Sequence, residues 1–438
     1  MTNGILKSIN MKDKMYKIVI QSDQQDENLY QALKNEFKIY RATLRRSIRE
    51  AKRLYYFRIF NTFKNDIKKT WSIINDGLKH KVNDQLINKF VVENRTICDP
   101  DEIANEFNNY FINIGHNLSM HINTNCSYTD YLGAQHETRF KFHTVDNEHV
   151  TNIINKLKNK SSCGHDSISN KLIKRSKEAL VEPITILINQ MLQTGQFPNE
   201  LKLSKVKPLF KSGDSSKFSN YLPISLLPSI SKIYEYVLFY QLFDYFTINK
   251  LFCMHQYGFR PGHSTELAAL KLVDHLTKEV DRRNVPINIY IDLSKAFDTL
   301  DHTILLDKLS YYGISQFENE LFFNYLSERF QYVEYKGSKS ESKLISTGVP
   351  QGSILGPLLF LIYINDLPMA SNMFNMMMYF DDTTLYCNLS QHIHEFEINS
   401  ELVKVKEWLS SNKLSLIVSK TTLNYYYYYK CLFTQKIQ

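Results

Sequence analysis

The order of apolar and polar residues predicts alternating strands and helices. Strand-like runs occur at 205–211 and 287–293, and also at 376–378 and 383–387, on either side of Asp381-Asp382. Strands separated by helices indicate an α+β core with helices packed on one sheet face. Apolar residues at helical spacing predict helices over 29–77, 101–117, 150–157, 171–180, 183–194, 231–246, 264–280, 304–312 and 397–409.

Asp381 and Asp382 stand at the predicted tip of a hairpin between two buried strands. Adjacent carboxylates repel each other and are costly to desolvate without a cation, although such a pair is more often a solvated turn. A third acid, Asp292, ends the strand-like run 287–293 and faces away from its isoleucine stripe. Three carboxylates at strand ends could hold two divalent ions, as phosphoryl-transfer enzymes do.

Charge is concentrated near the start of the chain. The 438 residues carry a net charge of +8, and residues 1–80 hold 17 Lys and Arg against 8 Asp and Glu. Basic residues between Arg41 and Arg58 alternate with apolar ones on a predicted helix. This pattern suits either a nucleic-acid backbone or a solvated helix face. Residues 81–143 are polar and Asn-rich, which indicates a connector before a new unit near His143.

Several classes of protein are disfavoured. The first 17 residues contain no apolar stretch typical of a signal peptide, and the longest apolar run, 354–364, is too short to span a bilayer. We therefore expect a soluble intracellular protein with no membrane partner. The six cysteines are scattered, with neither a disulfide framework nor zinc-ligand spacing, so all are expected to be reduced.

Three motifs, in order, carry a family resemblance. They are Ile291-Asp-Leu-Ser-Lys-Ala-Phe-Asp298, Gly348-Val-Pro-Gln-Gly-Ser-Ile-Leu-Gly-Pro357 and Phe380-Asp-Asp-Thr-Thr-Leu385. The chain resembles the reverse transcriptases of non-LTR (LINE-type, Jockey-like) retrotransposons. The resemblance covers about residues 144–424 and includes 195–198, 220–227, 256–260 and 412–421.

This resemblance implies a right-hand polymerase fold, with fingers and palm built around an antiparallel sheet and packed helices. It implies a basic helical connector over 1–143 and a reverse transcriptase domain over 144–438, with core motifs at about 190–424. The thumb would be largely missing, as in a fragment of a retrotransposon's second open reading frame. Nuclear action is also an implication of the family.

The implied activity is RNA-directed DNA synthesis, in which a DNA primer is extended with deoxynucleoside triphosphates on an RNA template. Asp292, Asp381 and Asp382 would hold two Mg²⁺ ions, with Mn²⁺ as a substitute. One ion would activate the primer 3′-hydroxyl and the other would bind the triphosphate. Lys420 matches the lysine proposed to protonate the leaving pyrophosphate.

The resemblance also implies a nucleotide-binding set. Phe297 would block a ribose 2′-hydroxyl, Lys211 would contact the triphosphate, and Gln351 and Gly352 would lie against the nucleotide and template. Leu293 belongs to the same set through its place beside Asp292.

One substitution weakens this interpretation. Leu222 stands where the family carries an arginine that grips the nucleotide phosphates. An alternative is therefore a catalytically inactive relic that at most binds RNA, and another is a template-independent nucleotidyltransferase. Asp298 is expected to be structural and bonded to nearby backbone. The run Tyr425–Tyr429 has no functional interpretation, and the sequence does not indicate an oligomeric state.

Overall fold

The computed structural model describes residues 3–22, 27–63, 69–70, 73–74, 89–92, 95–120, 122, 124–389, 395–427 and 430–436. At 3, 27–28, 389, 395, 425–427 and 430–436 only the backbone is described. The chain divides into two compact units, Met1–Leu86 and Ile87–Gln438. Each unit is described by itself. In the described parts of the chain, no helix is both long enough and apolar enough to cross a membrane.

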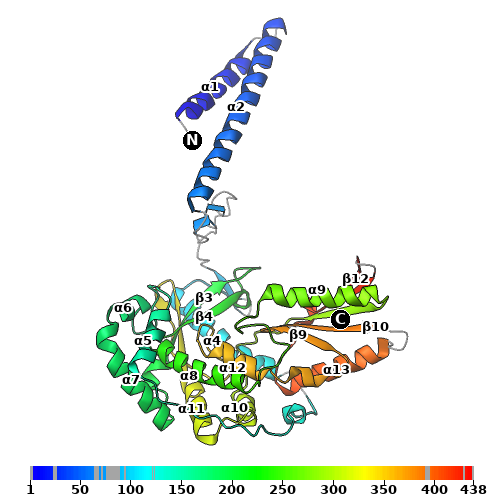
Figure 1. The fold of residues 1–438 in the computed structure, drawn as a ribbon. Coiled ribbons are helices and arrows are strands. Elements are labelled where there is room, and N and C mark those ends of the chain that lie inside the picture. Colours follow the sequence, from blue (N-terminus) through cyan, green and yellow to red (C-terminus); the bar gives the residue numbers. More distant parts are fainter. Residues whose placement is uncertain are drawn as a thin grey trace. The chain divides into compact units, whose positions relative to one another are not determined.

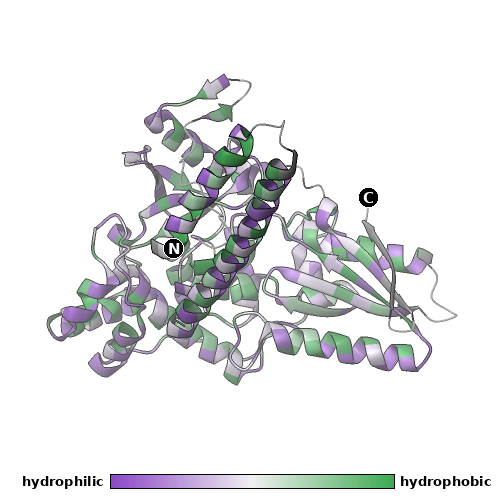
Figure 2. Ribbon diagram, turned by 90° about the horizontal axis from the view of Figure 1, so that it is seen from above, coloured by the Kyte–Doolittle hydropathy of each residue, from purple (hydrophilic) through white to green (hydrophobic). Residues whose placement is uncertain are grey.

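The first unit contains a pair of packed helices, α1 (Asn3–Gln21) and α2 (Glu27–Phe63) (Figure 1). The Tyr16 and Phe37 rings lie 5.6 Å apart between them. The prediction of a basic helix is confirmed as far as Phe63, whereas residues 64–68, 71–72 and 75–77 lie outside the described residues. Hydrophobic and hydrophilic residues alternate along both helices (Figure 2), and Phe57 is 65% exposed.

The second unit contains a five-stranded sheet, called here the β5 sheet, with the strand order β12-β11-β5-β10-β9. All neighbouring strands in it are antiparallel. This confirms the strands predicted around 287–293 and on both sides of Asp381-Asp382. The strands are β5 (Val285–Ile291), β9 (Asn375–Tyr379), β10 (Asp382–Leu389), β11 (Thr422–Tyr427) and β12 (Lys430–Lys436).

Part of the tyrosine run extends this sheet. Tyr425 pairs with Ile287 of β5 on one side and with Phe433 of β12 on the other. The sequence analysis found no role for this run, and the backbone now shows a structural one. Tyr428 and Tyr429 lie outside the described residues.

A second sheet, called here the β3 sheet, has the order β4-β3-β6-β7, with β8 also paired to β6. Strands β3 and β6 are parallel, and the other pairs are antiparallel. The strands are β3 (Ser204–Phe210), β4 (Tyr221–Leu226), β6 (Arg329–Tyr335), β7 (Ser338–Lys339) and β8 (Lys343–Ile345). Only β3 was predicted as a strand.

Helix α4 (Pro100–Ser119) packs on the β3 sheet and belongs to the second unit. Phe107 is fully buried there, and the Asn108 amide donates to the backbone oxygen of Gln331 on β6. The compact unit therefore begins at Ile87, earlier than the boundary expected near residue 143. A short hairpin, β1 (Phe90–Val92) with β2 (Arg95–Ile97), precedes α4.

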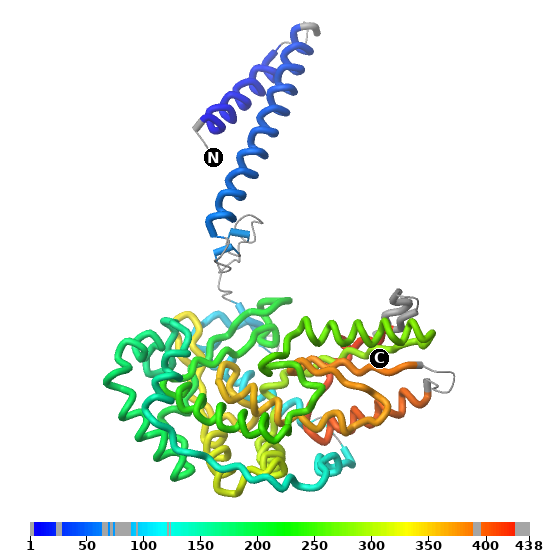
Figure 3. The backbone as a smooth tube through the Cα atoms, viewed as in Figure 1, coloured from blue at the N-terminus to red at the C-terminus, as the bar shows by residue number. Residues whose placement is uncertain are grey.

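The remaining helices of the second unit surround the two sheets. Helices α5–α7 lie at one end of this unit and the β5 sheet at the other (Figure 1, Figure 3). The helices are α5 (Asn147–Lys156), α6 (Asn170–Arg175), α7 (Lys177–Thr194), α8 (Ser229–Ile248), α9 (Thr265–Asp281), α10 (His302–Tyr311), α11 (Gln316–Leu326), α12 (Gly356–Tyr363) and α13 (Glu395–Ser411).

Side chains on both faces of the β5 sheet are buried, so the expectation of helices on one face was wrong. Met377 and Tyr386 form a small cluster with Ala268 of α9. Leu385, which alternates with Tyr386 along β10, faces the main core together with Trp408 of α13. Because successive side chains of a strand point to opposite faces, a sheet with apolar residues at both parities needs cover on both.

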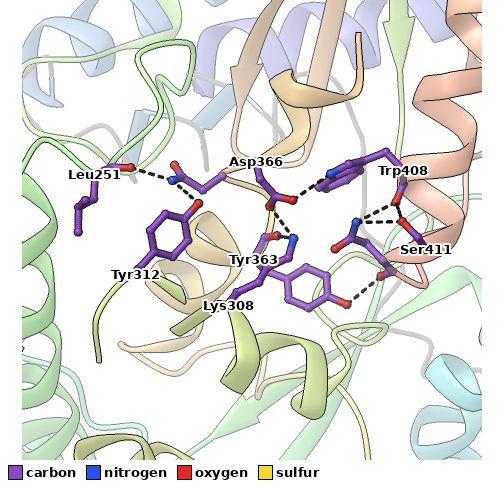
Figure 4. Close-up of polar contacts among 9 residues, drawn as sticks. Leu251, Lys308, Tyr312, Tyr363, Asp366, Trp408 and Ser411 are labelled. Atoms are coloured by element: carbon purple, nitrogen blue, oxygen red, sulfur yellow. Dashed lines mark hydrogen bonds and ion pairs between the residues drawn. The ribbon is translucent and has the colours of Figure 1, made fainter. Parts of the chain in front are cut away.

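A buried ion pair lies in the main core beneath this sheet (Figure 4). Lys308 is fully buried, and its Nζ donates to Asp366 Oδ1 at 2.5 Å and to the Tyr363 backbone oxygen at 2.6 Å. Trp408 Nε1 donates to Asp366 Oδ2 at 3.0 Å, and the Tyr363 hydroxyl donates to the Asn412 backbone oxygen at 2.8 Å. The network ties α10, α12 and α13 together.

Candidate active site

The two adjacent aspartates stand at the tip of the β9–β10 hairpin, as predicted. Asp382 pairs with Tyr379, and Phe380 between the strands has φ +62°. Burial raises the pKa of Asp381, and the nearby carboxylates of Asp382 and Asp292 raise it further, whereas Lys211 lowers it. The three acids are therefore close enough to interact electrostatically.

Asp292 lies near a carboxylate at the start of β10 and an ammonium group from the segment before β11. Thr383 pairs with Ile291, so the register of β10 brings Asp382 beside Asp292, whereas Lys420 ends a short 3-10 helix, Val418–Lys420, just before β11. Lys420 Nζ donates to Asp292 Oδ2 at 2.6 Å, and the two side chains are 53% and 30% exposed. The structure thus brings Lys420 directly to the aspartates.

The aspartates suit a hard divalent cation by the chemistry of their donors. Carboxylate oxygens are the ligands that Mg²⁺ prefers, and their mutual repulsion favours a cation between them. Within the described residues, no three His, Cys, Asp or Glu side chains already converge on a point where a metal ion could bind. One Asp292 oxygen is instead engaged by Lys420.

Phe297 packs against the aspartate hairpin. Its ring centroid lies 4.8 Å from that of Phe380 and 5.8 Å from that of Phe360 on α12. Phe380 also contacts the Phe259 ring at 4.9 Å. The partly buried Phe297 ring is therefore fixed beside the residues that precede the aspartates.

Gln351 is held by Asp298. Its Nε2 donates to the two Asp298 oxygens at 2.9 and 2.8 Å, and its backbone oxygen accepts from Ser225 N at 2.8 Å. Burial raises the pKa of Asp298 to about 6, and the Gln351 hydrogen bond opposes this rise. The expectation that the Asp298 carboxylate bonds to nearby backbone is replaced by this side-chain pair. Gly352 has φ +130°, and a Cβ there would lie 2.6 Å from the Ser225 oxygen, so glycine is required.

Leu222 shares a sheet face with Lys205, Lys207 and Lys211. Leu222 pairs with Leu209 and Ile224 pairs with Lys207, and the alternation of β3 places Lys211 on the same face. Lys211 is exposed and acts electrostatically on Asp381. The arginine that the family carries at Leu222 is thus missing from a face that keeps other cations.

Leu293 lies in the core rather than at the surface. It is 5% exposed and forms a β-bridge with Leu416. A nucleotide contact at this position would therefore have to come from its backbone.

Glu235 was missed by the sequence analysis. This carboxylate is fully buried on α8, and its Oε2 accepts from the Ile354 and Leu355 amides at 2.5 and 3.3 Å. It fixes the segment that joins Gln351 to α12. The signal in the sequence was an acid within an apolar stretch of the helix predicted over 231–246.

The comparisons with known proteins agree with this geometry. Residues 211–432 match the family model described as "Reverse transcriptase (RNA-dependent DNA polymerase)". This match covers the aspartates, the Gln351 segment and Lys420. The chain belongs to the reverse transcriptase family.

Two curated relatives of this reverse transcriptase chain are from mobile elements of Drosophila melanogaster. The chain is 32% identical over 228 residues to the probable RNA-directed DNA polymerase from transposon BS, which is 50% of this chain and 24% of that protein. It is 30% identical over 243 residues to the RNA-directed DNA polymerase from mobile element jockey, which is 55% of this chain and 26% of that protein. The matches thus span about a quarter of the length of these relatives.

Proposed function

We propose that this chain is an RNA-directed DNA polymerase that extends a DNA primer with deoxynucleotides on an RNA template. The observation that carries the proposal is the placement of Asp292 beside Asp382 in the β5–β10 register and in an ion pair with Lys420, with Asp381 next to Asp382. The family membership and the Drosophila relatives support the same reaction.

In the proposed reaction, Asp292, Asp381 and Asp382 hold two Mg²⁺ ions, for which Mn²⁺ can substitute. Bound there, the ions would lower the pKa of the primer 3′-hydroxyl and stabilise charge on the triphosphate. Lys420 contributes an ammonium group at the same place. It neutralises Asp292 before substrate binds and can give a proton to the departing pyrophosphate.

The nucleotide itself would lie among Phe297, Gln351 and Lys211. Phe297, fixed against Phe380, forms a wall that excludes a ribose 2′-hydroxyl. Asp298 orients the Gln351 amide, so that the base pair meets a fixed side chain. Lys211 supplies positive charge for the triphosphate. The functional boundaries remain as inferred from the motifs, with the polymerase core at about 190–424 and an RNA-binding role for the basic helix α2.

Leu222 favours a second candidate, a relic that binds RNA without synthesis. A missing charge-assisted contact of this kind costs about 1.5–3 kcal/mol of nucleotide affinity, which weakens a polymerase without abolishing it. Lys211 on the same face would reduce this loss, whereas Lys207 there already pairs with Glu334 at 3.2 Å. We therefore place polymerase activity first.

The test is primer extension on poly(rA)/oligo(dT) with Mg²⁺ and then Mn²⁺. The chain is compared with an Asp381→Ala/Asp382→Ala variant, and circular dichroism establishes that both are folded. Extension by the unaltered chain alone, and only with template, supports the proposal. Equal inactivity of two folded proteins would refute it, and salt-sensitive RNA binding would then identify the relic. Extension without template would indicate a nucleotidyltransferase.

A further inference from the structure

The aspartate hairpin contains a strained residue. Phe380 has φ +62°, in the left-handed region that a bulky side chain rarely adopts, and it directly precedes Asp381. A strained conformation at this position persists only if neighbouring groups hold it. The direction of the two aspartates depends on the same peptide.

The Gln256 side chain holds Phe380 in this conformation by hydrogen bonds. Its Oε1 accepts from the Phe380 amide at 2.9 Å and from the Gly258 amide at 2.7 Å, and its Nε2 donates to the Phe380 oxygen at 3.3 Å. The side chain is 2% exposed, so water does not compete for these bonds. One amide group thus satisfies both polar groups of the Phe380 backbone.

The segment around Gln256 lies against the end of β9. Tyr257 N donates to the Met378 oxygen at 2.7 Å, and Met378 N donates to the His255 oxygen at 2.8 Å. A Cβ at Gly258 would lie 2.4 Å from the Phe380 amide nitrogen, so this close approach requires glycine.

This segment is itself fixed by Asn365, the residue before Asp366 of the buried ion pair. The Asn365 Oδ1 accepts from Cys253 N at 2.7 Å, and its Nδ2 donates to the Leu251 oxygen at 2.8 Å. Arg260 also donates to the Cys253 oxygen at 2.8 Å. Gln256 therefore acts from a rigid base.

We propose that Gln256 is a positioning residue: it holds Phe380 in its left-handed conformation and thereby aims Asp381 and Asp382 at a divalent cation. The inference rests on the proposed function, in which these aspartates bind metal. A buried glutamine with only a structural role would stabilise the fold without affecting cation affinity. Removal of groups that orient metal ligands typically weakens metal binding 10- to 100-fold.

Gln241 supplies a matched control. It holds the His143 backbone in the same two-way manner, accepting from its N at 2.8 Å and donating to its O at 2.9 Å, on helix α8. Gln256→Met and Gln241→Met each remove one such clamp with little change in volume. Only the first touches the aspartate hairpin.

The experiment is a Mn²⁺ titration followed by electron paramagnetic resonance, with no nucleic acid present and at a temperature where all variants are folded. We expect Gln256→Met to raise the Mn²⁺ dissociation constant about tenfold or more, and Gln241→Met to leave it unchanged. Gln256→Glu keeps the acceptor for both amides and, as a neutral carboxyl at this buried position, a donor for the Phe380 oxygen. It should therefore stay within about threefold of the unaltered chain, below the loss that removal of an orienting group causes.

Two results would overturn this inference and leave the proposed function intact. One is unchanged Mn²⁺ affinity in Gln256→Met when Asp381→Ala/Asp382→Ala has lost it. The other, which applies even if Gln256→Met does not fold, is a tenfold loss in a folded Gln256→Glu variant, because the retained acceptor would then not matter. If the unaltered chain binds no Mn²⁺, or the aspartate variant binds it equally well, the metal role in the proposed function fails and takes the inference with it.

Discussion

Replacing Lys308 by methionine should strongly destabilise the second unit. Asp366 is 5% exposed, and without the ammonium its carboxylate would keep a single described donor, Trp408 Nε1 at 3.0 Å. A buried charge left without its partner typically costs about 3–5 kcal/mol. Against a total stability of about 5–15 kcal/mol, this is a large fraction.

Two further variants separate the free-energy cost of losing one charge from that of losing the whole ion pair. Lys308→Met/Asp366→Leu removes both charges, so it should be less harmful than Lys308→Met alone, although Trp408 then loses its acceptor. Lys278→Met is a matched control because its partner Asp274, at 2.6 Å, and Lys278 itself are 55% and 63% exposed. That variant should cost less than about 1 kcal/mol.

Urea unfolding followed by fluorescence tests this. The chain has two tryptophans, so in a Trp71→Phe background the signal comes from Trp408, inside the network. We expect the midpoint of Lys308→Met to fall by about 1–2 M, at a slope near 3 kcal/mol per M. A fall in midpoint no larger than that of Lys278→Met would refute the stabilising role assigned to the buried pair. A double variant as unstable as Lys308→Met alone would refute it too.

Four further results are expected. Lys420→Gln should change stability by less than about 1 kcal/mol, because the pair with Asp292 is partly exposed, yet slow nucleotide addition about 100-fold in single-turnover assays; equal rates would exclude the acid role. Burial raises the pKa of Asp298 from 3.8 to about 6, so its ionisation makes the free energy of unfolding fall between pH 4 and 6, by at most about 3 kcal/mol. Asp298→Asn should flatten this change in urea titrations, and parallel curves would contradict it. Leu222→Arg should lower the nucleotide KM about tenfold through a charge-assisted contact, in steady-state extension with dTTP. Phe297→Val should raise ribonucleotide incorporation in competition assays, and unchanged sugar selectivity would refute the role of Phe297 in excluding the 2′-hydroxyl.

Local patterns predicted the parts of the site that lie within single hairpins and strands. The Asp381-Asp382 tip and the strand before Asp292 were both readable from apolar runs, since each requires only near neighbours. Motif order then linked them to Lys420. The contact of Lys420 with Asp292 itself, across 128 positions of sequence, needed the tertiary structure, because it forms outside the paired strands.

Other elements depend on contacts distant in sequence. Helix α4 looked like part of a connector because asparagines dilute its apolar residues, yet Phe107 packs on a strand more than 200 residues later. Strand β6 pairs in parallel with β3. Parallel strands are joined by long connections, so no local turn in the sequence indicates which strands pair. The Gln351–Asp298 bond and the hydrogen bonds between Gln256 and Phe380 likewise join residues far apart in the chain.

The buried network of Figure 4 has a consequence for local opening. Asn365, next to Asp366, holds the loop that carries Gln256, and Asn412, which accepts from Tyr363, begins the stretch that leads to Lys420. Both stretches end at the aspartates but share one core. In amide hydrogen exchange, the Phe380 and Lys420 amides should therefore exchange as one cooperative group, opening only when the Lys308–Asp366 core opens.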